Sequence, residues 1–228
     1  MNHPITTLKT NKTATPSRLI NHIKVLLAFA ILLVLSGTPA LANSASNPYS
    51  LVEHVANATL KRINAEQQQI KNDPNHLKTI VSDELMPHID HKFASRYILH
   101  KIKTNKAQRK DFYLAFKGYL TTTYATVFAA FDNQTIEFEQ AKAIKPELKR
   151  VLINTHVIDK DKPPTPIDFK MRKSKKTGKW KAYDLRANGI SLLDSKKAEL
   201  IPLLRQPGGI DKVIEILNQK AAADIKKS

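Results

Sequence analysis

Apolar and polar residues alternate along the stretch from Pro166 to Leu193, and this alternation is the clearest structural signal in the chain. In its first half the two sets fall on opposite faces: Ile167, Phe169 and Met171 against Asp168, Lys170 and Arg172. A period of two is typical of a β-strand with one buried face. The sequence therefore predicts a strand here, at the centre of a sheet.

A turn and a return strand follow this first strand. Gly178 ends the polar segment Lys175–Gly178, and glycine adopts the positive φ of a tight hairpin loop without a steric penalty. Beyond the turn, Trp180 and Tyr183 have opposite parity in the alternation. The pattern therefore predicts a hairpin but leaves open which face of the return strand lines the interior.

The segments before the hairpin have a helical period instead. Apolar residues recur there every three to four positions, which predicts helices over residues 47–70, 74–87, 93–98 and 106–131. Short alternating runs predict strands at 135–138 and 149–158, and helical patterns return in the closing region after residue 193. Helices grouped before strands favour an α+β fold over alternating βαβ units. We expect a helical lobe on a twisted antiparallel sheet, curved into a cone around an apolar pocket.

The longest predicted helix, 106–131, has an unusually aromatic face. Its stripe consists of Phe112, Phe116, Tyr119, Leu120, Val127, Phe128 and Phe131. Most such stripes pack directly into a core, because protein interiors are close-packed. The alternative is that these bulky side chains line a cavity, and the stripe alone does not decide between the two.

The first 42 residues have the layout of a secretory signal peptide. Basic residues precede an apolar run, 25–35, which is too short to span a bilayer, and Ala40-Leu41-Ala42 fits a small-residue cleavage site. An uncleaved N-terminal anchor is the alternative. We expect a mature chain of residues 43–228, with a helical part, 47–131, and a part containing the sheet and closing helices, 132–228.

Composition narrows the possible functions. The net charge of +17 indicates either an anionic partner or a role in solubility, and the charge alone does not distinguish the two. The chain has no cysteine, which excludes thiol catalysis and cysteine metal sites. It also lacks the glycine-rich loops that bind nucleotide phosphates.

Few residues suggest catalysis. His88, Asp90 and His91 lie close together, but a catalytic zinc needs three protein ligands and no third partner is evident, so we predict no metal site. Asp184 on the return strand is the one candidate for a general base inside a cone. Its structural interpretation is an exposed carboxylate at the end of a strand, or a carboxylate paired with Arg186 or Lys170. We predict no catalytic residue.

Lysine and arginine crowd the hairpin. They are either a solvated face that keeps the sheet from pairing with other chains, or a docking surface for acidic groups. Arg172, Lys173 and Lys176 are our candidates for docking. Nucleic acid is an unsuitable partner, because a signal peptide directs the chain out of the cytosol and no aromatic residues are interleaved with these lysines for base stacking.

A specific segment runs from Lys162 to Ser191 and contains Thr177-Gly178, Trp180, Tyr183-Asp184 and Gly189-x-Ser191. In order and spacing, this segment and several others resemble the MlaC family of periplasmic phospholipid-binding proteins, also called the toluene-tolerance family. The opening helix NPYSLVEHVANATLKRI, the aromatic segment QRKDFYLAFKGYL and the C-terminal LLRQPGGIDKVIEIL also resemble family segments. The resemblance covers nearly all of the mature chain.

The resemblance implies a sheet cone related in shape to nuclear transport factor 2-like proteins, without a cofactor. It implies a periplasmic carrier that binds phospholipid tails as cargo. The implied partners are an inner-membrane MCE-type transporter subunit and an outer-membrane lipoprotein–porin complex, and the implied role is to maintain the lipid asymmetry of the outer membrane. A small periplasmic enzyme or binding module on the same cone is the alternative.

From their apolar patterning toward a common interior, the expected tail-contacting residues are Phe116, Leu120, Phe128, Val151, Ile153, Phe169, Met171, Trp180 and Tyr183.

Overall fold

The computed structural model describes residues 47–131, 134–160 and 162–226. All of them belong to one compact unit of the chain, Leu41–Ser228. The predicted signal peptide, its cleavage site and the first residues of the mature chain lie outside the described residues. No helix in the described part has both the length and the apolar character that crossing a membrane requires.

Helices come first along the chain, as the periodicity predicts. They are α2 (Pro48–Ala65), α3 (Gln67–Asn72), α4 (His76–Ile80), the π-helical turn η1 (Val81–Leu85), the 3₁₀ turn η2 (Met86–His88), α5 (His91–Ile98) and α6 (Lys106–Ala129). Asn47 caps α2, where its side chain accepts a hydrogen bond from the Tyr49 amide at 2.9 Å. Asn105 and Gln108 form a reciprocal capping box at the start of α6.

Two predicted helices are divided. The helix expected over 47–70 breaks at Glu66, whose amide closes the last turn of α2 on the Arg62 carbonyl at 2.9 Å. The helix expected over 74–87 is α4 followed by η1 and η2. Pro87 lies in η2, and proline has no amide hydrogen with which to continue an α-helix.

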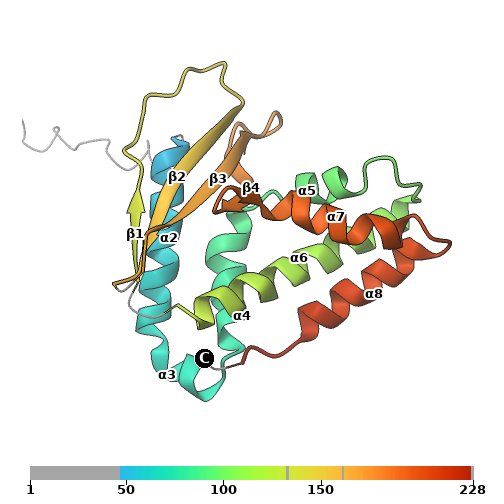
Figure 1. Ribbon diagram of the computed structural model, residues 1–228, viewed down its shortest axis with the longest axis horizontal. Helices are drawn as coiled ribbons and strands as arrows, with labels where there is room; N and C mark the ends of the chain where they lie inside the picture. Colours follow the sequence, from blue (N-terminus) through green and yellow to red (C-terminus); the bar gives the residue numbers. More distant parts are fainter. Residues whose placement is uncertain (1–46, 132–133, 161, 227–228) are drawn as a thin grey trace, which may run out of the picture. The chain divides into compact units, whose positions relative to one another are not determined.

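A five-stranded antiparallel meander follows the helices (Figure 1). It consists of β1 (Thr135–Phe138), β2 (Arg150–Ile158), β3 (Thr165–Lys173), β4 (Trp180–Ala187) and β5 (Ile190–Ser191), paired in sequence order. The chain closes with α7 (Leu192–Leu204) and α8 (Gly209–Ala222). The predicted α+β class is confirmed, with an open antiparallel sheet.

A bulge in β4 accounts for the conflicting parity of Trp180 and Tyr183. Met171 pairs with Ala182 and Lys170 pairs with Asp184, so Tyr183 is an extra residue without a partner in the register. The bulge keeps Trp180, Ala182 and Leu185 on one face of the strand. Tyr183 instead contacts Phe93 of α5, with ring centroids 5.0 Å apart.

Two groups of buried side chains hold the unit together. The first joins the inner face of the sheet to α2, α4 and η1, and includes Ile80, Val81, Ile153, Met171 and Trp180. The second joins α5, α6, α7 and α8, and includes Ile98, Phe112, Leu200, Val213 and Leu217. In Figure 1, α5 to α8 gather beside the β4 side of the sheet, and α2, which contacts both β2 and β4, crosses behind the strands. Leu120 of α6 packs against both groups.

Candidate functional site

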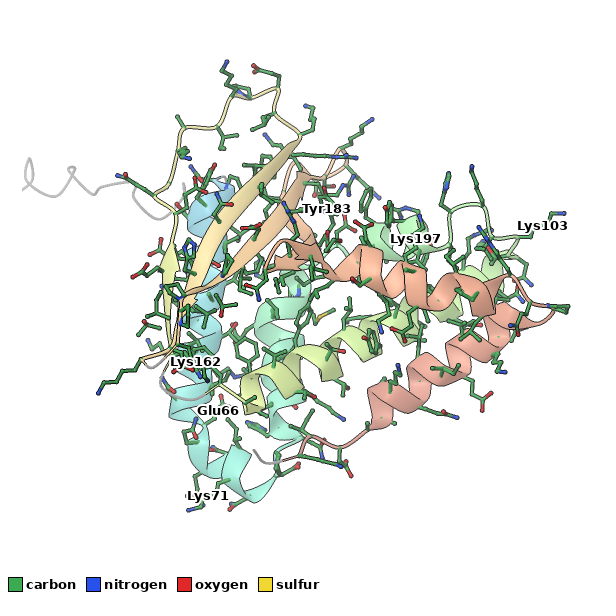
Figure 2. All side chains as sticks on the ribbon, viewed as in Figure 1. Glu66, Lys71, Lys103, Lys162, Tyr183 and Lys197 are labelled. Carbon is green, nitrogen blue, oxygen red and sulfur yellow. The ribbon has the colours of Figure 1, made fainter. Side chains whose placement is uncertain are left out.

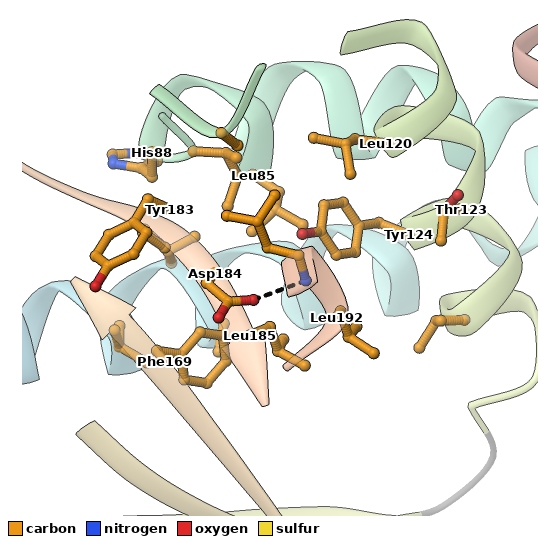
Figure 3. Close-up of a pocket in the computed structure, with 18 of the residues that line it drawn as sticks. Leu85, His88, Leu120, Thr123, Tyr124, Phe169, Tyr183, Asp184, Leu185 and Leu192 are labelled. Carbon is orange, nitrogen blue, oxygen red and sulfur yellow. Dashed lines mark hydrogen bonds between the residues drawn. The ribbon is translucent and has the colours of Figure 1, made fainter. Parts of the chain in front are cut away.

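A cavity of about 480 Å³ lies between the sheet and the helices (Figure 3). Its walls come mainly from α2, α6, β3, β4 and α7, with single residues from η1, η2, α5 and β1. Ligand-binding pockets in proteins commonly measure about 300–1,000 Å³. The cavity is therefore large enough for a small molecule or part of a larger apolar one.

The walls are mainly apolar. They include Leu51, Val52 and Val55 of α2 and Leu120 and Phe128 of α6. Two threonine hydroxyls in the wall are satisfied within their own helix: Thr59 donates to the Val55 carbonyl at 2.7 Å, and Thr123 donates to the Tyr119 carbonyl at 2.9 Å. A threonine whose hydroxyl is bonded this way adds a methyl group and little free hydrogen-bonding capacity to the wall.

Tyr124 places a phenol in the cavity wall (Figure 3). Burial raises the pKa of Tyr124 to about 12, with smaller contributions from Asp184 and Tyr119. The phenol is therefore neutral at physiological pH. It adds no charge to the interior, which suits an apolar ligand.

Asp184 is the one buried carboxylate among the described residues of the wall, and each of its contacts is structural. Its carboxylate lies 2.7 Å from Lys170 Nζ and accepts hydrogen bonds from Ser191 Oγ at 2.7 Å and the Leu193 amide at 3.0 Å. Ser191 is the N-cap of α7. The carboxylate therefore fixes the start of α7 to β4, and one of these interactions is dashed in Figure 3. The pairing with Lys170 agrees with one structural interpretation of Asp184, whereas the other, an exposed carboxylate at the end of a strand, is wrong, because the side chain is 2% exposed. These contacts give no support to a general base.

The solvent exposure of the lining residues shows where the cavity opens. Among the described residues that line the cavity, only Val127, Leu192, Ser195 and Glu199 are exposed. Val127 belongs to the last turns of α6, and the other three belong to the first two turns of α7. The cavity therefore opens between these two helices.

Six of the nine residues predicted to contact lipid tails line this cavity. They are Phe116, Leu120, Phe128, Phe169, Met171 and Tyr183. The other three, Val151, Ile153 and Trp180, are absent from its wall. Ile153 and Trp180 are 1% and 2% exposed within the first core group, and Val151 packs against that group. The apolar alternation identifies the inner face of the sheet, but it does not separate the wall from the core beside it.

Sequence reasoning missed the part of the wall that comes from α2 and α7. The apolar stripe of α2 is evident in the sequence as Leu51, Val52, Val55 and Thr59, but nothing in it distinguishes a cavity wall from an ordinary core face. In α7, the lining residues are Leu192, Leu193, Ser195, Lys196 and Glu199, and three of them are polar. The three polar residues lie on one helical face with Leu192, and a face of this polarity is typical of a solvent-facing surface.

The three candidate docking residues have different surroundings. Arg172 forms an ion pair with Asp90, and its guanidinium carbon lies 4.4 Å from the centroid of the Phe93 ring. Lys173 is half-buried at the end of β3, and Lys176 is exposed in the turn that follows. Arg172 therefore stabilises the contact between β3 and α5, whereas Lys176 faces solvent.

The histidines near Pro87 do not form a metal site in the described structure. The described residues contain no group of three or more histidine, cysteine or acidic residues that could hold a metal ion. Burial, with nearby lysines, lowers the pKa of both His88 and His91. Both are therefore neutral at pH 7, and His88 contributes to the cavity wall without a charge.

An α+β domain with an apolar cavity between sheet and helices has the architecture of a binding protein for an apolar ligand. The chain matches the MlaC protein family over residues 53–219, and it belongs to this family.

Relatives and a solved structure agree with this assignment. The chain is 30% identical over 203 residues to the intermembrane phospholipid transport system binding protein MlaC of Haemophilus influenzae, covering 88% of this chain and 93% of the relative. It is 25% identical to the toluene tolerance protein ttg2D of Pseudomonas putida, covering 85% and 93%. Its fold is similar to that of a phospholipid-binding protein from Ralstonia solanacearum solved in complex with a phospholipid, with a TM-score of 0.67 and 20% identity over 77% of this chain and 97% of that one.

Proposed function

We propose that this protein is a periplasmic carrier of phospholipid, which holds acyl tails in the cavity and leaves the head group at the mouth between α6 and α7. The observation that carries the proposal is the cavity of about 480 Å³, with its apolar walls and a single opening side marked by exposed lining residues of the described chain. The name of the Haemophilus influenzae relative describes phospholipid transport, and the similar solved structure contains a phospholipid; both support the same cargo.

The energetics of acyl chains explain why a carrier needs such a cavity. Each CH₂ group buried away from water contributes about 0.8 kcal/mol. A tail exposed during transfer through water would therefore be strongly unfavourable. The neutral Tyr124 and the internally bonded threonines allow the walls to accept tails without a desolvated charge.

The test of this function is to identify what the purified protein holds. We expect organic extracts of the mature protein to contain diacyl phospholipid in a fixed ratio to protein, measured by mass spectrometry and phosphate analysis. Washed protein should also take fluorescent phospholipid from vesicles and deliver it to acceptor vesicles. Extracts without phospholipid, from protein that is folded by circular dichroism and takes up none from vesicles, would contradict the proposal.

The location belongs to the same proposal. Residues 1–42 direct export and are removed after Ala42, so N-terminal sequencing of the protein from the periplasmic fraction should read Asn-Ser-Ala-Ser. A chain that begins at Met1 in the membrane fraction would contradict export with cleavage.

The partners proposed for delivery and uptake are an inner-membrane MCE-type transporter subunit and an outer-membrane lipoprotein–porin complex. No cofactor is needed for this role, because phospholipid is the cargo.

A further inference from the structure

A group of charged and aromatic side chains lies at one end of the cavity mouth. Lys196 Nζ forms an ion pair with Glu199 and lies 4.8 Å from the centroid of the Tyr119 ring. Lys220 of α8 lies on the other side of Glu199, with its Nζ 3.3 Å from the carboxylate and 6.0 Å from the Tyr119 ring centroid. We call Tyr119, Lys196, Glu199 and Lys220 the lysine pair site.

This site continues the wall of the cavity. Tyr119, Lys196 and Glu199 are lining residues, and the Lys196 side chain is only 17% exposed. Along the same face of α7, Leu192 begins the mouth with an apolar, exposed side chain. Val127, also an exposed lining residue, belongs to the last turns of α6. The mouth therefore has an apolar end at Leu192 and a cationic end at Lys196.

The charges at the cationic end do not balance. Among the described residues, Glu199 is the carboxylate that pairs with both Lys196 and Lys220. Burial opposes the charged form of Lys196, but its bonds with Glu199 and Tyr119 outweigh burial and raise its pKa above the usual value. Two ammonium groups thus share one carboxylate beside an apolar cavity, which leaves one positive charge for an anion from the ligand.

We propose that Lys196 binds the phosphodiester of a diacyl glycerophospholipid whose tails occupy the cavity. The inference rests on the proposed carrier function and adds to it a specificity for phosphate at the mouth. When the phosphodiester arrives, Glu199 keeps its pair with Lys220, and Lys196 exchanges Glu199 for a phosphate oxygen. Each ammonium group then has its own anion, and the exchange needs no charge to be buried alone.

The sharpest test compares ligands with the same tails, with and without phosphate. The mature protein is incubated with vesicles that contain dioleoylphosphatidylglycerol, dioleoylphosphatidylethanolamine and dioleoylglycerol in equal amounts. It is then re-isolated, and its cargo is quantified by mass spectrometry. The measured quantity is the ratio of bound phospholipid to bound dioleoylglycerol, which does not depend on how much of the variant is folded.

The variants separate charge from position. Lys196→Met removes the ammonium group and keeps a long side chain, whereas Lys196→Arg keeps a cation. Lys197→Met is the matched control, because Lys197 is the next residue on α7 (Figure 2) but stacks on Tyr97 outside the cavity, 4.0 Å from the ring centroid. We expect Lys196→Met to lower the ratio about tenfold for both phospholipids, as the loss of one charge-assisted bond predicts. Lys196→Arg and Lys197→Met should keep the wild-type ratio.

Each other outcome has a definite meaning. A wild-type ratio in Lys196→Met, with both ligand classes still bound, overturns the assignment of Lys196 but leaves the carrier function intact. Binding of neither class by the wild-type protein overturns the carrier function itself. Binding of inorganic phosphate to the lipid-free protein tests the source of the phosphate: if the wild-type protein binds it, Lys196→Met does not, and the two proteins have the same cargo ratio, Lys196 is a site for free phosphate and the inference fails.

Discussion

The ammonium group of Lys170 lies 2.7 Å from the Asp184 carboxylate, on neighbouring strands of the sheet. The Asp184 side chain is 2% exposed and that of Lys170 is 28% exposed, so the pair is shielded on one side only. The same carboxylate holds Ser191 and the Leu193 amide at the start of α7. Asp184 therefore couples the sheet to the helix that forms one side of the cavity mouth.

Removal of this carboxylate should destabilise the fold. We expect Asp184→Ala to lower the free energy of unfolding by about 2 kcal/mol, because the Leu193 amide and Lys170 lose a buried partner. This figure allows for the partial exposure of Lys170, which weakens the ion pair. Urea unfolding followed by circular dichroism measures the change. Asp168→Ala is the control, since Asp168 lies 3.8 Å from Arg186 and should contribute less than about 1 kcal/mol. Equal stability of the two variants would mean that Asp184 does not anchor α7.

Variants of two leucines on α6 test whether acyl tails occupy the cavity. Leu120 lines the cavity, whereas Leu114 of the same helix is 59% exposed. Leu120→Asp puts a carboxylate where acyl tails would lie, and we expect co-purified phospholipid to fall by about tenfold or more, since burial of an unpaired charge is very unfavourable. Leu114→Asp should leave the lipid content unchanged. Phosphate analysis of extracts measures the phospholipid bound to each variant. A full lipid load in folded Leu120→Asp would mean that the tails bind outside this cavity.

Tyr124 should titrate late. Its pKa of about 12 lies above the usual 10.0 because burial disfavours the phenolate. The native state therefore keeps a proton that the unfolded chain has lost, so this contribution to stability is complete below pH 10 and disappears as the pH rises toward 12. An absorbance titration at alkaline pH should show one late component in the wild-type protein that Tyr124→Phe lacks. Tyr97, whose pKa is also raised, mainly by its bond with Asp194, remains in both proteins and cancels in the comparison.

The alternation and periodicity of the sequence predict much of the fold because they reflect local geometry. The range of β1 is the predicted one, 135–138, and α6 begins at Lys106 where Asn105 supplies a cap. The sequence does not predict the bulge at Tyr183, because the contacts of this residue come from distant parts of the chain. The Tyr183 ring packs on Phe93, and its centroid lies 6.0 Å from the Arg150 guanidinium. Strand parity alone contains no information on such contacts.

The site shows the same division between local and distant information. The apolar stripes of α2 and α6 and the inner face of the sheet can be read from the sequence, and together they supply most of the wall. Whether two apolar faces meet or leave a space depends on how far apart the backbones lie, which periodicity does not encode. For this reason Ile153 and Phe169, cross-strand partners on one face, could not be separated into a core residue and a wall residue.

The last prediction concerns docking on partner proteins, and the structure changes how it should be tested. Arg172 pairs with Asp90 and stacks on Phe93, so Arg172→Glu would put a carboxylate beside Asp90 and destabilise the contact between β3 and α5. The informative variant is therefore Lys173→Glu with Lys176→Glu, at the end of β3 and in the exposed turn. Both should leave the lipid content unchanged, because neither residue lines the cavity.

If the hairpin meets acidic groups on a partner, this double variant should slow the transfer of fluorescent phospholipid to an MCE-type acceptor, because charge complementarity acts mainly on the rate of encounter. The wild-type rate should fall as salt shortens the screening length to about 8–10 Å and below. Lys71→Glu with Lys103→Glu is the control: it changes the net charge equally at two exposed lysines on other parts of the fold (Figure 2). Slower transfer by the hairpin variant alone supports docking through this turn. Equal rates for both variants, with a flat salt response, would mean that docking uses another face and that the lysines of the hairpin serve solubility.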